Sequence, residues 1–135
     1  MTLPQERWLS KAREDLAVAK ICLKEHFFNQ VCFHAQQTAE KAIKAWITAC
    51  DQTYPKSHDL LRLAAHLPQI QSVLSEELRN LQFLNQFYVP ARYPDAPAGN
   101  LPEGMPNLEQ TQKALQTAEE ILRIAERNIL EITEP

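Results

Sequence analysis

The sequence lacks any apolar run near the ~20 residues that cross a bilayer. Residues 1–15 carry charges where a secretory signal peptide needs its apolar stretch. The three cysteines, Cys22, Cys32 and Cys50, are an odd number without the spacing of a disulfide framework, which favours reduced thiols. Together these absences predict a cytoplasmic protein.

The sequence also has no strong charge of either sign. Its formal net charge is −3, so no global field draws it to nucleic acid, and any such binding depends on a local patch. With 44% hydrophobic and 23% charged residues, its composition is that of a globular protein and not of a disordered one. Its 135 residues suffice to fold without a disulfide or a metal. We therefore predict a single domain over residues 1–135.

Several motifs of well-known chemistry are missing. The sequence contains no Gly-x-Ser-x-Gly nucleophile, no phosphate-binding Gly-x-x-x-x-Gly-Lys and no His-Glu-x-x-His zinc motif. Cys22 and His26 are four apart, but this spacing is loose relative to zinc motifs, and a free cysteine usually behaves as a small buried hydrophobe. We predict no metal and no cofactor.

What the sequence does contain is the spacing of amphipathic helices. Apolar residues recur three and four apart in five segments, which predict helices at roughly residues 5–26, 30–50, 57–67, 70–88 and 107–131. Ser57 is the expected N-cap of the short third helix, and Asn107 with Gln110 forms a capping box for the last. The pattern predicts an all-α, antiparallel up-and-down bundle of four main helices plus one short helix.

One long segment breaks the helical pattern. Residues 89–106 hold five of the nine prolines and both glycines, which predicts a loop because proline lacks the amide hydrogen that a helix needs. A loop of this length is unusual in a compact domain and is often functional.

The second predicted helix carries a polar stripe. His34, Gln37, Lys41 and Lys44 are spaced three, four and three, so they share one face that can hold a phosphate-bearing ligand. The alternative is an ordinary solvated helix face. His58 lies at the start of the third helix, where backbone amides favour anions; the alternative is a surface histidine in a cap motif, which is the commoner case.

The segment from Tyr88 to Asp95 places Arg92 between Tyr88 and Tyr93 and frames it with prolines. Prolines pre-set the backbone, so the arginine is presented at little entropic cost. A guanidinium can bind phosphate with two hydrogen bonds, and a tyrosine can stack on a nucleobase. Alternatively, the tyrosines pack on the end of the bundle and Arg92 pairs with a local carboxylate.

In their order along the chain, these segments resemble the HEPN family, the "higher eukaryote and prokaryote nucleotide-binding" domain. The resemblance covers roughly residues 6–95 and rests on four segments: Trp8 with Asp15-Leu16-x-x-Ala19; His34-Ala-Gln-Gln37-Thr-Ala-Glu40-Lys41-Ala42-x-Lys44-Ala45; Ser57-His58-Asp59-Leu60-x-x-Leu63; and Tyr88-x-x-x-Arg92-Tyr93-Pro94. The second and the fourth are the specific ones.

The resemblance implies a bundle that dimerises and that often acts beside a small nucleotidyltransferase in toxin–antitoxin or defence pairs. Many family members are metal-independent ribonucleases with an Arg-x(4–6)-His motif late in the bundle. From Arg92 that histidine would fall at residues 97–99, where Pro97, Ala98 and Gly99 stand. Because RNA cleavage by general acid–base chemistry normally uses a histidine, the resemblance favours a binder over an enzyme.

We therefore expect a dimeric nucleotide- or RNA-binding module that partners or regulates a nucleotidyltransferase, with no assigned catalytic residue. The expected nucleotide- or phosphate-binding residues are Arg92, Tyr93, Lys41, Lys44, His34, Gln37, His58 and Tyr88. Two alternatives stay open. One is a ribonuclease with a rearranged site that recruits His34 or His58, and the other is a structural dimer or scaffold without a ligand.

Overall fold

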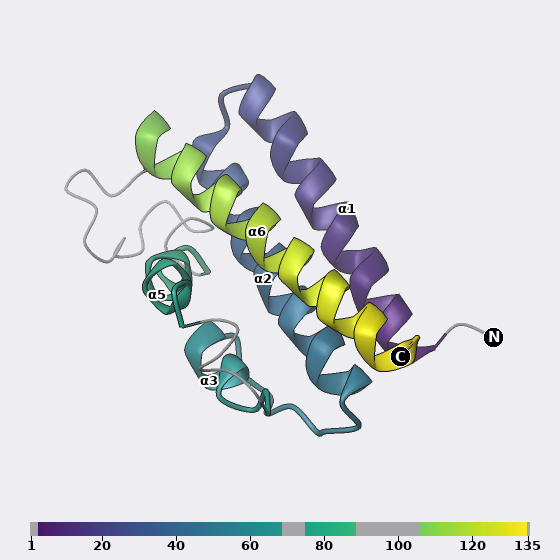
Figure 1. Ribbon diagram of the computed structural model, residues 1–135. Helices are drawn as coiled ribbons and strands as arrows, with labels where there is room; N and C mark the ends of the chain where they lie inside the picture. The colour runs from purple at the N-terminus through teal and green to yellow at the C-terminus, as the bar shows by residue number, and fades with distance from the viewer. Residues whose placement is uncertain (1–2, 69–74, 89–105, 135) are drawn as a thin grey trace.

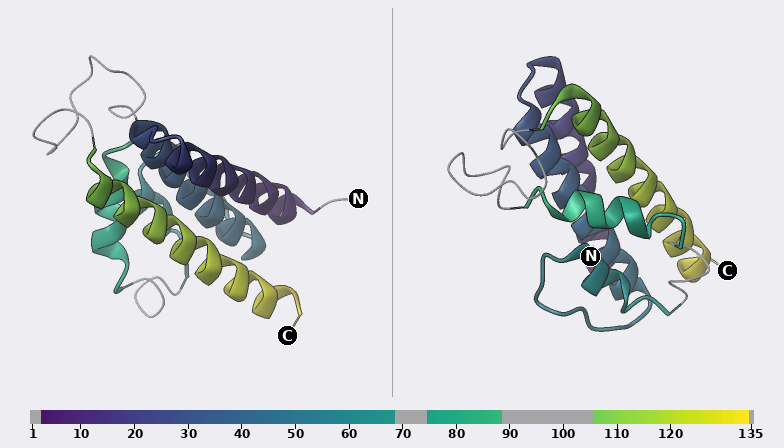
Figure 2. Two further views of the ribbon diagram at one scale, coloured as in Figure 1. Left: turned by 90° about the horizontal axis from the view of Figure 1, so that it is seen from above. Right: turned by 90° about the vertical axis from the view of Figure 1, so that its left-hand side faces the viewer.

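The structure is a computed structural model that describes residues 3–68, 75–88 and 106–134. The described residues form helices and their connections, without a strand, so the predicted all-α bundle is confirmed. Three long helices form its body and two short helices lie against one side (Figures 1 and 2). The long helices are α1 (Pro4–Lys24), α2 (Phe28–Ala49) and α6 (Leu108–Thr133), and the short ones are α3 (Leu60–Ala64) and α5 (Leu78–Asn85).

Among the three long helices, α1 runs antiparallel to both α2 and α6 (Figure 1). Residues 25–27 form the short connection between α1 and α2, so these two helices run antiparallel, and His26 takes a positive φ of 61° there. The described ends of α1 and α6 that lie nearest the two termini are at the same end of the molecule, so α6 runs antiparallel to α1 and in the same direction as α2 (Figure 1). The short helices carry the chain back between α2 and α6.

The core is centred on α2, which packs most extensively against α1 and α6 and also contacts α3 and α5. Its core alanines are fully buried, which lets neighbouring backbones approach closely. Larger apolar side chains from the other helices and from the turn after α5 fill the remaining space, among them Leu63, Leu81, Phe87 and Ile121. No helix in the described ranges is long and apolar enough to cross a membrane.

The helix ends show which capping predictions hold. The capping box of α6 is present: Asn107 Oδ1 accepts from the Gln110 amide at 2.8 Å, and Gln110 Oε1 accepts from the Asn107 amide at 2.9 Å. The N-cap of α3 is Asp59, and not Ser57 as predicted. The carboxylate of Asp59 accepts from two amides of the first turn and is the stronger partner for the positive helix terminus, whereas Ser57 Oγ accepts from the Asp59 amide.

The predicted helix over residues 70–88 differs in extent. Residues 75–77 form a turn, and α5 begins at Leu78 and ends at Asn85, so its described length is eight residues. Residues 69–74 lie outside the described part of the chain, as does most of the predicted loop. Asn85 ties α5 to α3, because its side chain accepts from the Leu60 amide at 2.8 Å and donates to Asp59 at 2.9 Å.

Candidate nucleotide-binding site

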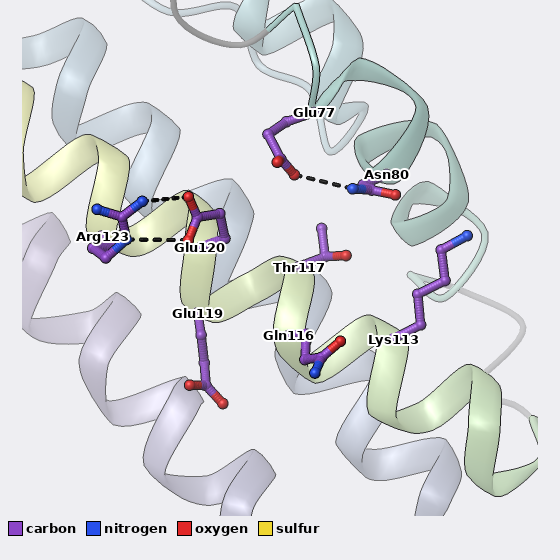
Figure 3. A pocket seen from close by; sticks show the side chains of 8 residues that line it. All are labelled: Glu77, Asn80, Lys113, Gln116, Thr117, Glu119, Glu120 and Arg123. Carbon is purple, nitrogen blue, oxygen red and sulfur yellow. Dashed lines mark hydrogen bonds and ion pairs between the residues drawn. The ribbon is translucent and has the colours of Figure 1, made fainter.

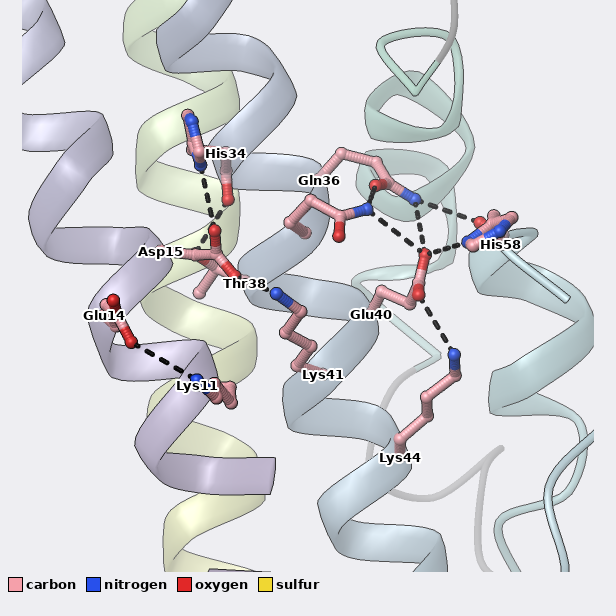
Figure 4. A network of polar contacts seen from close by, with 11 residues as sticks. Lys11, Glu14, Asp15, His34, Gln36, Thr38, Glu40, Lys41, Lys44 and His58 are labelled. Atoms are coloured by element: carbon pink, nitrogen blue, oxygen red, sulfur yellow. Dashed lines mark hydrogen bonds and ion pairs between the residues drawn. The ribbon is translucent and has the colours of Figure 1, made fainter. Parts of the chain in front are cut away.

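The polar stripe predicted on α2 is present, but its side chains divide between two carboxylates (Figure 4). His34 and Lys41 point toward Asp15 on α1, while Lys44 points toward Glu40 on α2 itself. Helical spacing placed these residues near one another along α2, whereas their contacts divide between Asp15 and Glu40. The spacing did not predict the Asp15 contact, because Asp15 lies on a different helix.

Asp15 is buried between α1 and α2 and contacts both His34 and Lys41. Its Oδ1 lies 2.9 Å from Nδ1 of His34, and its Oδ2 accepts from Nζ of Lys41 at 2.5 Å. Burial alone raises the pKa of this carboxyl, but the hydrogen bonds from His34 and Lys41 and the charge of Lys41 outweigh it and hold the pKa below its usual value. Asp15 is therefore a structural anion that fastens α1 to α2.

Glu40 is the centre of the second group and is 3% exposed. Its Oε2 accepts from Nζ of Lys44 at 3.0 Å, and its Oε1 lies 2.9 Å from Nδ1 of His58. Gln36 adds a further link, since its Nε2 donates to the backbone carbonyl of His58 at 3.0 Å, and Gln37 donates to Gln36 Oε1 at 2.8 Å. The network fixes the segment that precedes α3 against the middle of α2.

His58 and Tyr88 form the outward part of this network. Their rings stack with centroids 4.0 Å apart and planes within 15°, and the side chain of His58 is 53% exposed. Phe33 also lies beside Tyr88, with the two ring centroids 6.2 Å apart. The structure thus brings together two of the predicted site residues that are thirty positions apart in the sequence.

Lys44 faces inward and not toward a surface site. Its side chain is only 10% exposed, and its ammonium lies 5.3 Å from the ring centroid of Trp8 and 5.5 Å from that of Tyr54. Trp8 and Tyr54 meet edge to face, with centroids 5.7 Å apart. Sequence reasoning did not single out Tyr54, because no local spacing relates it to Trp8 at the start of α1.

Arg92 and Tyr93, the other two predicted ligand-binding residues, lie outside the described residues. Arg92 follows Tyr88 by four positions in the sequence. Their predicted role stays a prediction.

A hollow of about 610 Å³ lies between α5 and α6 (Figure 3). Two of its charged side chains pair with each other: Arg123 donates two hydrogen bonds to Glu120, and these hold the pKa of Glu120 below its usual value. Glu77 accepts from Asn80 at 3.1 Å. Because acids and cations both line this hollow, it has no surface of a single charge sign that would select a ligand.

The cysteines give no metal site in the described part of the chain. Burial raises the pKa of Cys32 to about 12, so its thiol stays protonated and makes a weak contact with Thr111 Oγ1 at 3.8 Å. Burial and the neighbouring charge of Asp51 raise the pKa of Cys50. Among the described residues no group of three or more histidine, cysteine or acidic side chains is placed to hold a metal ion.

The chain matches a known protein family along most of its length. The model of the HEPN domain family matches residues 5–128. The chain belongs to the HEPN family. The resemblance inferred from the four motif segments is thereby confirmed, and the match extends over α6, which those segments do not reach.

Relatives of this HEPN chain are found in both sequence and structure. It is 32% identical over 131 residues to a protein of Methanocaldococcus jannaschii that bears the name "Putative toxin MJ1304", covering 93% of this chain and 82% of the relative. The crystal structure of TT1696 from Thermus thermophilus is similar with a TM-score of 0.80 and 33% identity, covering 92% of this chain and 97% of the other. ST0689, an archaeal HEPN homologue, shares the fold with a TM-score of 0.73 at 24% identity, covering 95% and 99% of the two chains.

The buried anion of this HEPN domain makes its stability depend on pH. Because the pKa of Asp15 is lower in the folded protein than in the unfolded chain, its stabilisation is present at neutral pH and is lost as the pH falls through the folded-state pKa. We expect Asp15→Asn to lower the free energy of unfolding at pH 7 by about 2 kcal/mol, since it leaves His34 and Lys41 without their anion. Urea denaturation followed by circular dichroism measures this loss.

Glu14→Gln is the matched control, because Glu14 neighbours Asp15 but is exposed and lies 3.9 Å from an exposed Lys11. Its free energy of unfolding should stay close to that of the wild type. The difference in the free energy of unfolding between wild type and Asp15→Asn should become smaller as the pH is lowered below the usual carboxyl range. If this difference is the same at pH 7 and in acid, Asp15 is not the stabilising anion.

Proposed function

We propose that this chain is a nucleotide- or RNA-binding HEPN module that works as a dimer and as the partner or regulator of a nucleotidyltransferase in a toxin–antitoxin or defence-type pair. The observation that supports ligand binding is the stack of the exposed His58 ring on Tyr88. The buried carboxylate of Glu40 contacts Nδ1 of His58 and orients this ring. Arg92, which the sequence places four residues after Tyr88, is the proposed phosphate-binding residue.

The stack suits single-stranded RNA for physical reasons. A flat ring pair offers a surface on which a nucleobase can stack, and such contacts tolerate any base because every base has a π-face. The pair is already ordered by the Glu40 contact, so little side-chain entropy is lost when a ligand binds. The predicted lysines contribute less than their charge suggests, because Lys41 and Lys44 already neutralise Asp15 and Glu40.

Arg92→Ala and Tyr88→Ala test the ligand proposal. Loss of one base-stacking contact costs about 1–3 kcal/mol, so Tyr88→Ala should weaken binding of single-stranded RNA by at least about fivefold. We expect Arg92→Ala to weaken it by at least about tenfold, because a charged hydrogen-bond donor to phosphate is lost. Isothermal titration calorimetry with a short oligoribonucleotide measures both, and circular dichroism shows that the bundle stays folded.

Arg79→Ala serves as the control, because Arg79 is exposed on α5 and its replacement removes the same charge. Wild-type affinity in this variant shows that the loss in Arg92→Ala is local. If the wild-type protein binds neither RNA nor free nucleotides, the ligand half of the proposal is wrong.

The dimer and the partner are supported by family membership and by the toxin named among the relatives. We expect light scattering of the purified chain to give twice the mass of a 15.5 kDa protomer. We also expect a nucleotidyltransferase encoded by an adjacent gene to co-purify with it when the two are co-expressed and only this chain is tagged. A monomer at micromolar concentration contradicts the dimer, and recovery of the tagged chain alone contradicts the partnership.

A ribonuclease is the second candidate, and one observation favours it. His58 is exposed while its Nδ1 faces the buried Glu40, so the opposite ring nitrogen is free of that contact and the carboxylate orients the ring. A histidine oriented by a carboxylate in this way can accept and return a proton, as the cleavage of RNA at a 2′-hydroxyl requires.

Metal-free cleavage assays decide between binder and ribonuclease. If the site is catalytic, RNA is cleaved in the presence of EDTA, His58→Ala abolishes the cleavage and Glu40→Gln reduces it. His66→Ala is the matched control, because His66 is an exposed histidine just after α3 whose Nδ1 lies 3.1 Å from the carbonyl of Arg62. Cleavage that persists in His58→Ala rules out this catalytic assignment, and absence of cleavage in the wild type leaves the binding module.

A further inference from the structure

A hollow of about 620 Å³ opens beside the start of α1, on residues that the proposed RNA surface does not use. Its walls are the rings of Trp8 and Tyr54, Pro4 and the side chains of Arg7, Ser10 and Lys11. Pockets that hold small organic ligands fall in the range of roughly 300–1,000 Å³ and are mostly apolar with a few polar groups. This hollow therefore has the size and lining of a small-molecule site.

The charge of this hollow has one sign. Among the described side chains that line it, two are cations, Arg7 and Lys11, and none is an acid. Both cations are exposed, and the ion pair of Lys11 with Glu14 is long at 3.9 Å and lies in solvent. An exposed pair of this length is worth little, so both cations are available to an anion.

The two rings of the hollow are held in place by a buried cation. The ammonium of Lys44 lies within 5.3–5.5 Å of both ring centroids and is itself fixed by Glu40 at 3.0 Å. Trp8 and Tyr54 also contact each other edge to face. An aromatic surface that is ordered before the ligand arrives loses little conformational entropy on binding, which favours a flat ligand.

We propose that this hollow is a binding site for a nucleoside monophosphate. The base lies against Trp8 and Tyr54, and the phosphate is bound by the guanidinium of Arg7 and the ammonium of Lys11. Planar aromatic surface and paired cations at one end are the two features that such a ligand matches at once, since base stacking and charged hydrogen bonds to phosphate supply separate parts of its affinity. The residues that line the hollow do not include His58 or Tyr88 of the proposed RNA surface.

Trp8 reports directly on this site. The chain has two tryptophans, and the other, Trp46, is 4% exposed within the core. We expect adenosine 5′-monophosphate to quench the fluorescence of the full-length protein, excited at 295 nm, in a saturable way. Trp8→Phe keeps an aromatic ring but should remove the response, because only Trp46 then emits.

The cations are tested by the double variant Arg7→Ala/Lys11→Ala. It should raise the dissociation constant for adenosine 5′-monophosphate by at least about tenfold, because two charged donors to phosphate are lost. Lys20→Ala/Lys24→Ala is the matched control, since both residues are exposed on the same helix and the change in charge is identical. Equal weakening in the two double variants, or no saturable quenching in the wild type, overturns the proposal.

A second titration separates this site from the proposed RNA surface. Adenosine 5′-monophosphate should quench the fluorescence of Arg92→Ala as it does that of the wild type. Arg7→Ala/Lys11→Ala should bind a short oligoribonucleotide with wild-type affinity. Quenching that requires the oligoribonucleotide and disappears in Arg92→Ala assigns the signal to the RNA surface and overturns the pocket. Quenching by the mononucleotide supports the pocket even if no RNA binds.

Discussion

The structure depends on the two buried carboxylates that balance the cations of α2. This helix is covered by α1 and α6 and contacted by α3 and α5, so its polar residues cannot all reach water. A charge removed from water is costly unless it is paired and hydrogen-bonded. Asp15 meets this requirement for His34 and Lys41, and Glu40 meets it for Lys44. The same contacts set the position of α1 against α2 and of the His58 segment against α2.

This balance changes how the polar stripe is interpreted. From the sequence, two lysines, a histidine and a glutamine on one face indicate a phosphate site. In the folded chain Lys41 and Lys44 are engaged with carboxylates, and the groups left at the surface by the Glu40 network are rings, those of His58 and Tyr88. Under the proposed function, a ligand at this place is therefore recognised first by stacking, and its phosphate depends on cations from elsewhere in the chain.

The sequence predicts the bundle well because its signals are local. Apolar spacing located α1, α2 and α6, and the Asn107–Gln110 box marked the start of α6 within one turn. The cap prediction failed at α3, where the Asp59 carboxylate, and not Ser57, accepts from the first-turn amides. No sequence pattern predicted the contacts between distant residues, such as Asn85 with Asp59 and Trp8 with Tyr54, because no periodicity relates them. Helical spacing gives the direction of a side chain but not its partner on another element.

Glu40 also links the stacked rings of His58 and Tyr88 to the rings of Trp8 and Tyr54. One of its oxygens binds Lys44, which lies against Trp8 and Tyr54, and the other faces His58, which stacks on Tyr88. A displacement of either ring pair changes the geometry at a shared carboxylate that is almost fully removed from water, where electrostatic interactions are screened least. Any free-energy coupling carried by this contact acts equally in both directions, because linkage between binding sites is reciprocal. A single buried acid is thus both a structural anchor of the bundle and a direct physical connection between its two ring pairs.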